Sequence, residues 1–213
     1  MRRPKRLPAE VVEEIGTRVD RAMAPRVVAR LADAVGAYER DRYADAQRMV
    51  VPLIRQAPDA PALRELSGLC HYREGHWGDA IRQLDQFRRL SGSLDQHPVL
   101  ADCHRALGHR AAVVELWDEL REASPNPALV AEGRIVMAES LADQHNMEQA
   151  IALLARSLRP NRVTRDYHLR QWYALADLYE RSGDLARARE LFVRVATHDS
   201  SLSDVTQRVK ALA

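Results

Sequence analysis

The chain of 213 residues is 46% hydrophobic and 29% charged, so it can bury a sizeable core and is not expected to be disordered. Its two cysteines, Cys70 and Cys103, exclude the disulfide framework of a small secreted domain. The formal net charge is +2, but residues 1–8 contribute four positive side chains and no acid. The rest of the chain is therefore slightly acidic and lacks the broad basic face of a dedicated nucleic-acid binder.

The beginning of the chain shows neither a secretory signal nor a membrane anchor. The basic side chains within residues 2–6 are followed by Glu10, Glu13 and Glu14 instead of an apolar signal core. The longest uncharged apolar run, residues 49–54, is far too short to cross a bilayer. We therefore expect a cytoplasmic protein without a membrane span.

Helical periodicity runs from Pro8 to the C-terminus, and no segment alternates at the period of two that a strand requires. Residues 1–8 form a basic arm that we expect to be disordered, and an N-terminal helix is predicted over 9–24. Over 25–199, proline, glycine and polar clusters interrupt the pattern at intervals of roughly 12–18 residues, which indicates helices joined by tight turns. Pro52 is expected to bend one of these helices. A last helix, within residues 200–213, is predicted to cap the array.

A repeated motif divides residues 25–199 into similar units. A second clear copy and three weaker copies, centred on Ala46, Val113 and Ala150, precede the clearest one, and the centres are 33 to 38 residues apart. The clearest copy consists of Trp172, Leu175, Ala176, Tyr179, Gly183, Leu185, Ala188 and Phe192, and the second of Gly68, Tyr72, Gly75, Trp77 and Ala80. These residue types at this spacing resemble the tetratricopeptide repeat, and the chain resembles a bacterial member of that family.

The resemblance implies an all-α fold, an α-α superhelix (solenoid) of about five helical hairpins with an extra N-terminal helix and a C-terminal capping helix. In such a hairpin, small residues such as Gly68 and Ala188 let the two helices approach closely. Gly183 is expected at the end of a first helix, where a positive φ is common. Replacing Ala188 by arginine should therefore be severely destabilising, whereas Asp184→Ala should matter far less.

The resemblance also implies a ligand groove, lined by the first helix of each hairpin. From Asp95 onward the corresponding positions hold seven acids against three arginines, so we expect a basic protein segment as ligand. The nearest such segment is the chain's own arm, with Arg2, Arg3, Lys5 and Arg6. Alternatively, these charges are only the solvated side of ordinary helices. The predicted groove residues are Glu65, Leu69, Tyr72, Arg73, Asp95, Asp102, Arg105, Glu132, Ile135, Glu139, Asp143, Arg170, Tyr173, Asp177, Glu180 and Arg181.

We therefore predict a protein- or peptide-binding scaffold or adaptor that has no catalytic residues and no cofactor. The phosphate-binding, dinucleotide-binding, serine-hydrolase and zinc-protease motifs are absent from the sequence. Family members that bind chaperone tails use lysine and asparagine where this chain has Glu65 and Leu69, so a chaperone tail is not the expected ligand. Two alternatives are a nucleic-acid-associated factor that uses the basic arm and a self-associating module, such as a homodimer.

One pattern of cysteine and histidine invites comparison with a metal site. Cys70, His71 and His76 recur 33 residues later as Cys103, His104 and His109. On one continuous helix these positions point in different directions, so they would not bind one metal ion together. The displacement equals the repeat period, so the common ancestry of the two repeats explains the recurrence. The sequence therefore predicts no metal.

Overall fold

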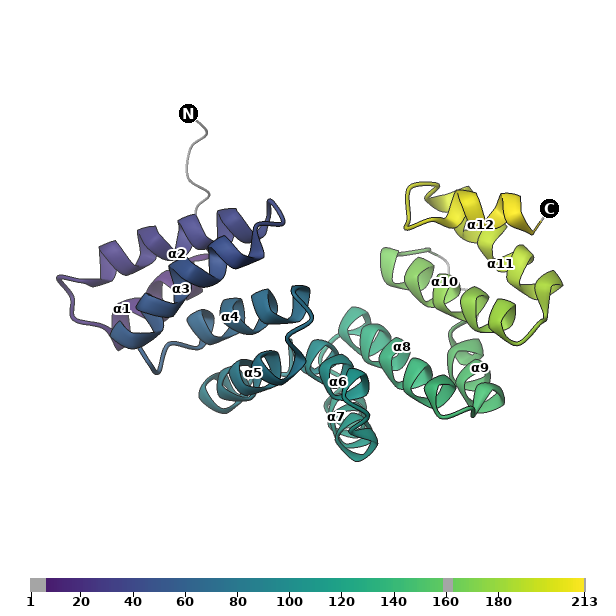
Figure 1. Cartoon of the computed structure of the whole chain (residues 1–213), viewed down its shortest axis with the longest axis horizontal. Helices are drawn as coiled ribbons and strands as arrows, with labels where there is room; N and C mark the ends of the chain where they lie inside the picture. The colour runs from purple at the N-terminus through teal and green to yellow at the C-terminus, as the bar shows by residue number, and fades with distance from the viewer. Residues whose placement is uncertain (1–6, 159–162, 213) are drawn as a thin grey trace. The chain divides into compact units, whose positions relative to one another are not determined.

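The computed structural model describes residues 7–158 and 163–212, and within these ranges it contains helices and no strand (Figure 1). The all-α helical-repeat fold predicted from the sequence is therefore confirmed. The basic side chains of the arm, Arg2, Arg3, Lys5 and Arg6, lie outside the described residues. Within the described ranges, no helix is both long enough and apolar enough to span a membrane.

The structure divides into two compact units, Met1–Gly108 and His109–Ala213. The helices of the first unit are α1 (Ala9–Arg18), α2 (Ala24–Tyr38), α3 (Tyr43–Gln56), α4 (Pro61–Arg73), α5 (Trp77–Ser91) and α6 (His97–Ala106). Those of the second unit are α7 (Arg110–Ala123), α8 (Pro127–Asp143), α9 (Met147–Ala155), α10 (Asp166–Arg181), α11 (Leu185–His198) and α12 (Val205–Ala211). A short 3-10 turn, Arg156–Leu158, follows α9.

In the first unit, the chain forms the hairpins α2/α3 and α4/α5, and each helix packs against the next. Helix α1 ends at Arg18, before the end of the predicted 9–24 segment. The reason is local, because the Asp20 carboxylate accepts a hydrogen bond from the Ala22 backbone N–H at 2.8 Å and holds a turn before α2 begins. Pro52 lies inside α3, as the sequence indicates.

The turn at the end of the first helix has the same construction in two hairpins. Gly75 and Gly183 adopt φ of 74° and 85°, which a residue with a Cβ rarely adopts. After each glycine, the next backbone N–H donates to a helix carbonyl: His76 to His71 and Asp184 to Tyr179, both at 2.9 Å. The predicted positive φ at Gly183 is confirmed, and these closures reverse the chain into the second helix.

The close approach of α4 and α5 depends on Gly68, which lies beneath Leu84 of the second helix. A Cβ added at Gly68 would stand 2.6 Å from the Leu84 Cδ2 atom and 3.3 Å from the Leu84 backbone nitrogen. The sequence-based role of Gly68 as a small contact residue therefore has a direct geometric basis.

Replacing Gly68 by alanine should lower the free energy of unfolding by about 1–3 kcal/mol, because Leu84 must move to admit the methyl group. Gly78→Ala in the same hairpin is the matched control, since a Cβ there meets no atom within 4 Å. The control should change stability little, or raise it by up to about 1 kcal/mol. Urea denaturation followed by circular dichroism compares the two variants, and equal midpoints would contradict the role assigned to Gly68.

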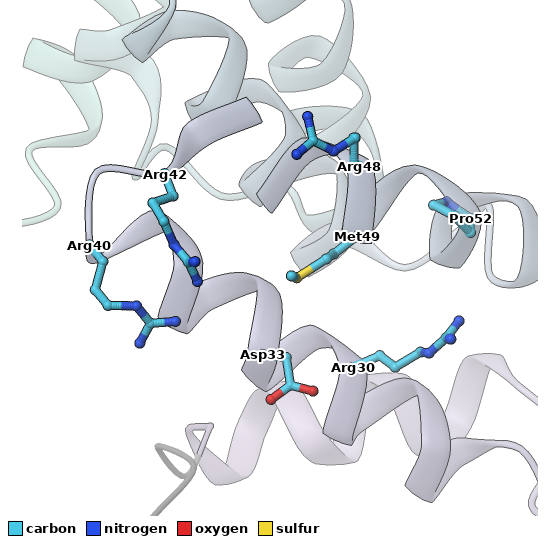
Figure 2. Close-up of a pocket in the computed structure, with 7 residues that line it drawn as sticks. All are labelled: Arg30, Asp33, Arg40, Arg42, Arg48, Met49 and Pro52. Carbon is cyan, nitrogen blue, oxygen red and sulfur yellow. The ribbon is translucent and has the colours of Figure 1, made fainter. Parts of the chain in front are cut away.

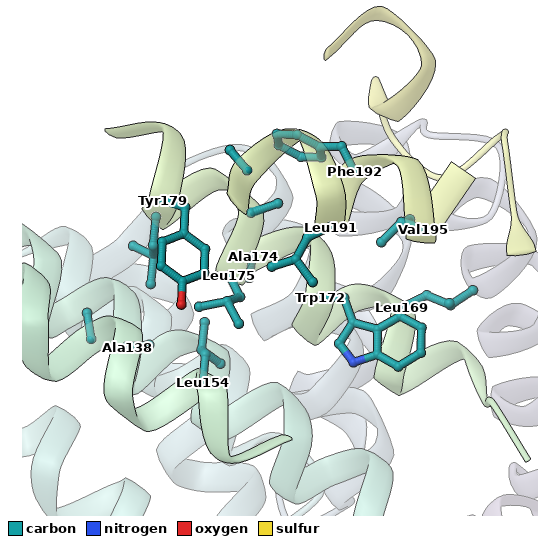
Figure 3. Close-up of a cluster of buried hydrophobic side chains, with 14 of the residues drawn as sticks. Ala138, Leu154, Leu169, Trp172, Ala174, Leu175, Tyr179, Leu191, Phe192 and Val195 are labelled. Atoms are coloured by element: carbon teal, nitrogen blue, oxygen red, sulfur yellow. The ribbon is translucent and has the colours of Figure 1, made fainter. Parts of the chain in front are cut away.

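The second unit is built around the hairpins α8/α9 and α10/α11, with α12 packed on α11. Its core gathers large side chains from several helices (Figure 3), including Trp172 and Leu175 of α10 and Phe192 of α11. Ala188 is fully buried in the same cluster. In the first unit α6 packs on α5, and in the second unit α7 packs on α8.

Candidate functional site

Helices α8 and α10 of the second unit border a cavity of about 400 Å³, which we call the α8–α10 groove. Asn126 starts α8, since its side chain accepts a hydrogen bond from the Leu129 backbone N–H at 2.8 Å. Helix α10 packs against both α8 and α9, which places a row of its side chains beside a row from α8. The lining residues are Glu132, Ile135, Glu139, Arg170, Tyr173, Ala174, Asp177, Leu202 and Ser203.

Six of these lining residues belong to the groove predicted from the sequence. They are Glu132, Ile135, Glu139, Arg170, Tyr173 and Asp177. The other two predicted residues of α10 do not line the cavity but form ion pairs. Arg181 pairs with Glu139, and Glu180 pairs with Arg208. Asp143, at the end of α8, is exposed and does not line the cavity.

The groove has an apolar floor that continues into the core of the unit. Ile135, Tyr173 and Leu202 are partly buried and pack against the hydrophobic cluster. The Tyr173 ring meets the Phe192 ring edge to face, with centroids 5.4 Å apart. The floor is therefore supported by buried side chains, and it offers apolar surface to a ligand.

Ion pairs occupy the rim of the groove. The Arg170 Nε atom lies 2.5 Å from Glu132 Oε1, and Arg181 Nη1 lies 2.7 Å from Glu139 Oε2 and 3.4 Å from Asp177 Oδ2. These side chains remain 24% to 43% exposed, so each pair contributes only about 0–1 kcal/mol to stability. The acids that the sequence assigns to a basic ligand thus already have arginine partners.

The segment after α11 supplies part of the site, which the sequence argument did not foresee. Leu202 and Ser203 line the groove, and Tyr173 donates its phenolic hydrogen to the Asp204 carboxylate. Arg208 of α12 contacts Asp177, and its Nε lies 3.2 Å from Glu180 Oε2. The predicted capping segment therefore also closes one side of the groove.

Burial, together with the hydrogen bond to Asp204, raises the pKa of Tyr173 above its usual value. The phenol consequently stays protonated at neutral pH. With its hydrogen directed to Asp204, its oxygen remains able to accept a hydrogen bond, and Ser203 donates one at 3.4 Å. The polar side of the groove is held in place by contacts within the protein.

In the first unit, the predicted residues form a different arrangement between α4 and α6. The Tyr72 hydroxyl donates to Asp102 Oδ2 at 2.8 Å, and Arg105 Nε donates to Asp102 Oδ1 at the same distance. Gln96 donates to Glu65 at 2.7 Å. Burial is the main cause of raised pKa values at Tyr72 and Glu65. This network joins the two helices.

The remaining predicted residues of this unit do not join that network. The Arg73 guanidinium lies over the Tyr43 ring, 4.6 Å from its centroid, and 3.5 Å from Asp41. Leu69 is partly buried, and Asp95 is exposed. Arg73 therefore binds across to the preceding hairpin rather than facing a groove.

A second concave surface, on α2 and α3, is basic and was not identified from the sequence. It encloses about 540 Å³ and is lined by Arg30, Asp33, Arg40, Arg42, Arg48, Met49 and Pro52 (Figure 2). Arg42 and Arg48 share the carboxylate of Asp45. Its arginines outnumber the acids that line or contact it, so this surface suits an anionic group, in contrast to the α8–α10 groove. Its arginines are spread over two helices and do not form a short sequence motif, so the sequence alone did not reveal this surface.

The two cysteines are buried, and burial raises the pKa of each thiol to about 12. Cys70 and Cys103 therefore stay protonated at neutral pH.

Stacked helical hairpins with a ligand-sized groove define a helical-repeat protein. A family model described as tetratricopeptide repeat matches residues 31–93 and 135–201, which together make up more than half of the chain. The chain therefore belongs to the tetratricopeptide-repeat family. The matched ranges cover most of the hairpins α2/α3 and α4/α5 and of α8/α9 and α10/α11. Tetratricopeptide repeats are generally protein-interaction scaffolds and not catalytic folds.

Solved structures of other tetratricopeptide proteins show the same fold. A thermophilic tetratricopeptide-repeat protein of Thermus thermophilus aligns over 86% of this chain and 96% of its own, with a TM-score of 0.66 and 18% identity. A putative kinesin light chain of Podosopora anserina with nearly identical repeats aligns over 83% of this chain and 98% of its own, with a TM-score of 0.61 and 17% identity. No curated protein sequence is significantly similar to the chain.

Proposed function

We propose that the chain is a non-catalytic scaffold and that it binds a segment of a protein partner in the α8–α10 groove. The observation that carries the proposal is the geometry of that groove. Side chains from two neighbouring repeats border one cavity of about 400 Å³, a size within the range of ligand sites. An apolar floor surrounded by charged groups supplies both contact area and orientation to a bound segment.

The groove favours a ligand that carries both apolar and basic side chains over one that is only basic. The acids Glu132, Glu139 and Asp177 line the cavity together with one arginine, Arg170. The partner arginines on the rim nevertheless compete with an incoming cation. We therefore expect the bound segment to insert an apolar side chain between Ile135 and Tyr173. A lysine or arginine beside that side chain would contact the acids of the lining.

A peptide library displayed on phage, selected against the immobilised full-length chain, tests the proposal directly. We expect the selected peptides to place an apolar residue next to a basic one. Fluorescence anisotropy with a labelled synthetic copy of a selected peptide then measures affinity. The double variant Glu132→Lys and Glu139→Lys should weaken binding about tenfold or more, because it reverses two charges and removes the glutamate partners of Arg170 and Arg181, leaving Arg181 only its contact with Asp177.

The matched control carries the same charge change on exposed acids of α7, with Glu115→Lys and Glu122→Lys. It should bind the peptide as the unaltered chain does, apart from a small salt-dependent loss. Melting temperatures of both double variants are measured first, so that a loss of fold is not mistaken for a loss of binding. If the two variants bind equally well, the groove is not the peptide site.

A further inference from the structure

Three potential metal ligands lie together in the first unit, at the turn between α4 and α5. His71, Glu74 and His76 each offer one ligand atom, and these three atoms lie within 4.8 Å of one another. His71 is on the last turn of α4, Glu74 directly follows that helix as its C-cap residue, and His76 immediately precedes α5. Two imidazoles and one carboxylate form a donor set that binds divalent transition metals.

The turn brings His76 back beside His71. Helix α4 ends at Arg73, and Gly75 takes a positive φ of 74°. The His76 backbone N–H then donates to the His71 carbonyl at 2.9 Å, and the two imidazole centroids come to 5.9 Å. His76 therefore lies beyond the end of α4, and the sequence-based expectation of one continuous helix through His71 and His76 is wrong.

A side chain of α3 contacts the His71 ring and orients it. The Gln47 side-chain amide, on α3, lies 2.8 Å from His71 Nε2. His71 Nδ1 is buried and has no hydrogen-bond partner among the described residues, and the same holds for Gln47 Oε1. When the amide turns its oxygen toward Nε2–H, the lone pair of Nδ1 becomes available to a cation. A histidine ligand commonly has such a partner on its second ring nitrogen.

The electrostatics of the cluster also suit a cation. Glu74 Oε2 lies 3.8 Å from His76 Nδ1 and supplies a negative charge. A cation close to His71, Arg82 of α5, contacts the carboxylate of Asp79.

We propose that His71, Glu74 and His76 bind one divalent transition-metal ion, with Zn²⁺ as the best fit. Tetrahedral Zn²⁺ with bonds of roughly 2.0–2.2 Å needs ligand atoms about 3.4 Å apart. The three atoms must therefore approach one another by up to about 1.4 Å, which follows from the 4.8 Å limit. The Glu74 and His76 side chains are 24% and 59% exposed and can rotate inward. Water occupies the fourth position, as in other sites with two histidines and one glutamate.

The next repeat supplies an internal comparison for this site. His104 and His109 follow 33 residues after the two histidines, and Gly108 has the same φ of 74° as Gly75. The residue that corresponds to Glu74 is Leu107, which is 43% exposed. The second copy thus has the two histidines and the positive φ of its glycine but lacks the carboxylate. Glu74→Leu gives the first copy the residue of the second and isolates the contribution of that ligand.

Isothermal titration of Zn²⁺ into the full-length chain, without an added histidine tag, tests the proposal at neutral pH. We expect one bound ion per chain in the unaltered protein. Glu74→Leu and His76→Ala should each weaken binding at least about tenfold. His109→Ala alters the exposed histidine of the second copy and should leave the affinity unchanged.

Thermal denaturation supplies an independent measurement. Zn²⁺ should raise the melting temperature of the unaltered chain and of His109→Ala, because binding to the folded state stabilises it. It should raise that of Glu74→Leu much less. The proposal is overturned if no ion binds, or if Glu74→Leu and His76→Ala bind Zn²⁺ as tightly as the unaltered chain while remaining folded by circular dichroism.

Discussion

Replacing Ala188 by arginine should destabilise the protein by more than about 4 kcal/mol, enough to unfold the second unit in mild denaturant. Ala188 has 0% exposure and belongs to the core cluster in which α10 packs against α11. An arginine there must displace close-packed side chains and bury a guanidinium that lacks a partner. Urea denaturation followed by tryptophan fluorescence measures the loss through Trp172, which lies in the same cluster.

The matched control is Ala186→Arg, at an exposed position on the same helix. It adds the same side chain to solvent and should change the free energy of unfolding by less than about 0.5 kcal/mol. Asp184→Ala has an intermediate expected effect. The Asp184 side chain caps α11 by accepting from the Arg187 backbone N–H at 3.1 Å, so its loss should cost about 1 kcal/mol. Similar midpoints for Ala188→Arg and Ala186→Arg would mean that α11 does not face α10 through Ala188.

Phe192→Ala should lower the free energy of unfolding by about 3–5 kcal/mol, the usual cost of removing a buried phenyl ring. Phe192 has 0% exposure and is among the largest fully buried side chains. Its ring contacts Tyr173 of the groove floor and lies 5.1 Å from the Arg208 guanidinium of α12. The cavity left by the substitution would therefore loosen two neighbours that border or close the α8–α10 groove.

The same variant should also weaken peptide binding to the groove, although Phe192 does not line it. Val193→Ala, at the next position and 38% exposed, is the control and should affect neither property strongly. Chemical denaturation gives the stability, and anisotropy with the selected peptide, under conditions in which both variants are folded, gives the affinity. A Phe192→Ala protein that is less stable but binds normally would show that the floor does not depend on this ring.

Local sequence patterns were sufficient to predict the helical fold and its close contacts. Helical periodicity predicts the helices, and glycine after a periodic segment predicts the positive φ of Gly183. Gly68 and Ala188 were identified as contact residues because a repeated motif places a small residue where two helices cross. These features depend on residues that are close in the sequence, so they can be predicted without knowledge of the tertiary structure.

The resemblance to the tetratricopeptide family implied the rows of groove residues, because the family's ligand positions follow one face of each first helix. Glu132, Ile135 and Glu139 lie on α8, and Arg170, Tyr173 and Asp177 lie on α10. Their charge was not predictable in the same way. The sequence indicates a surplus of acids, whereas the structure pairs Arg170 with Glu132 across 38 residues and Arg181 with Glu139 across 42 residues.

Tertiary structure alone decided the remaining features of the two candidate sites. The contact of Arg208 with Asp177 depends on how α12 returns to α10, and the contact of the His71 ring with Gln47 depends on α3 packing against α4. The basic surface of Arg30, Arg40, Arg42 and Arg48 depends on two helices lying side by side. The sequence determined which helices form and which faces they bury, since hydrophobic burial follows local periodicity. Partners of charged and metal-binding side chains are set by distances between segments, and those distances exist only in the folded chain.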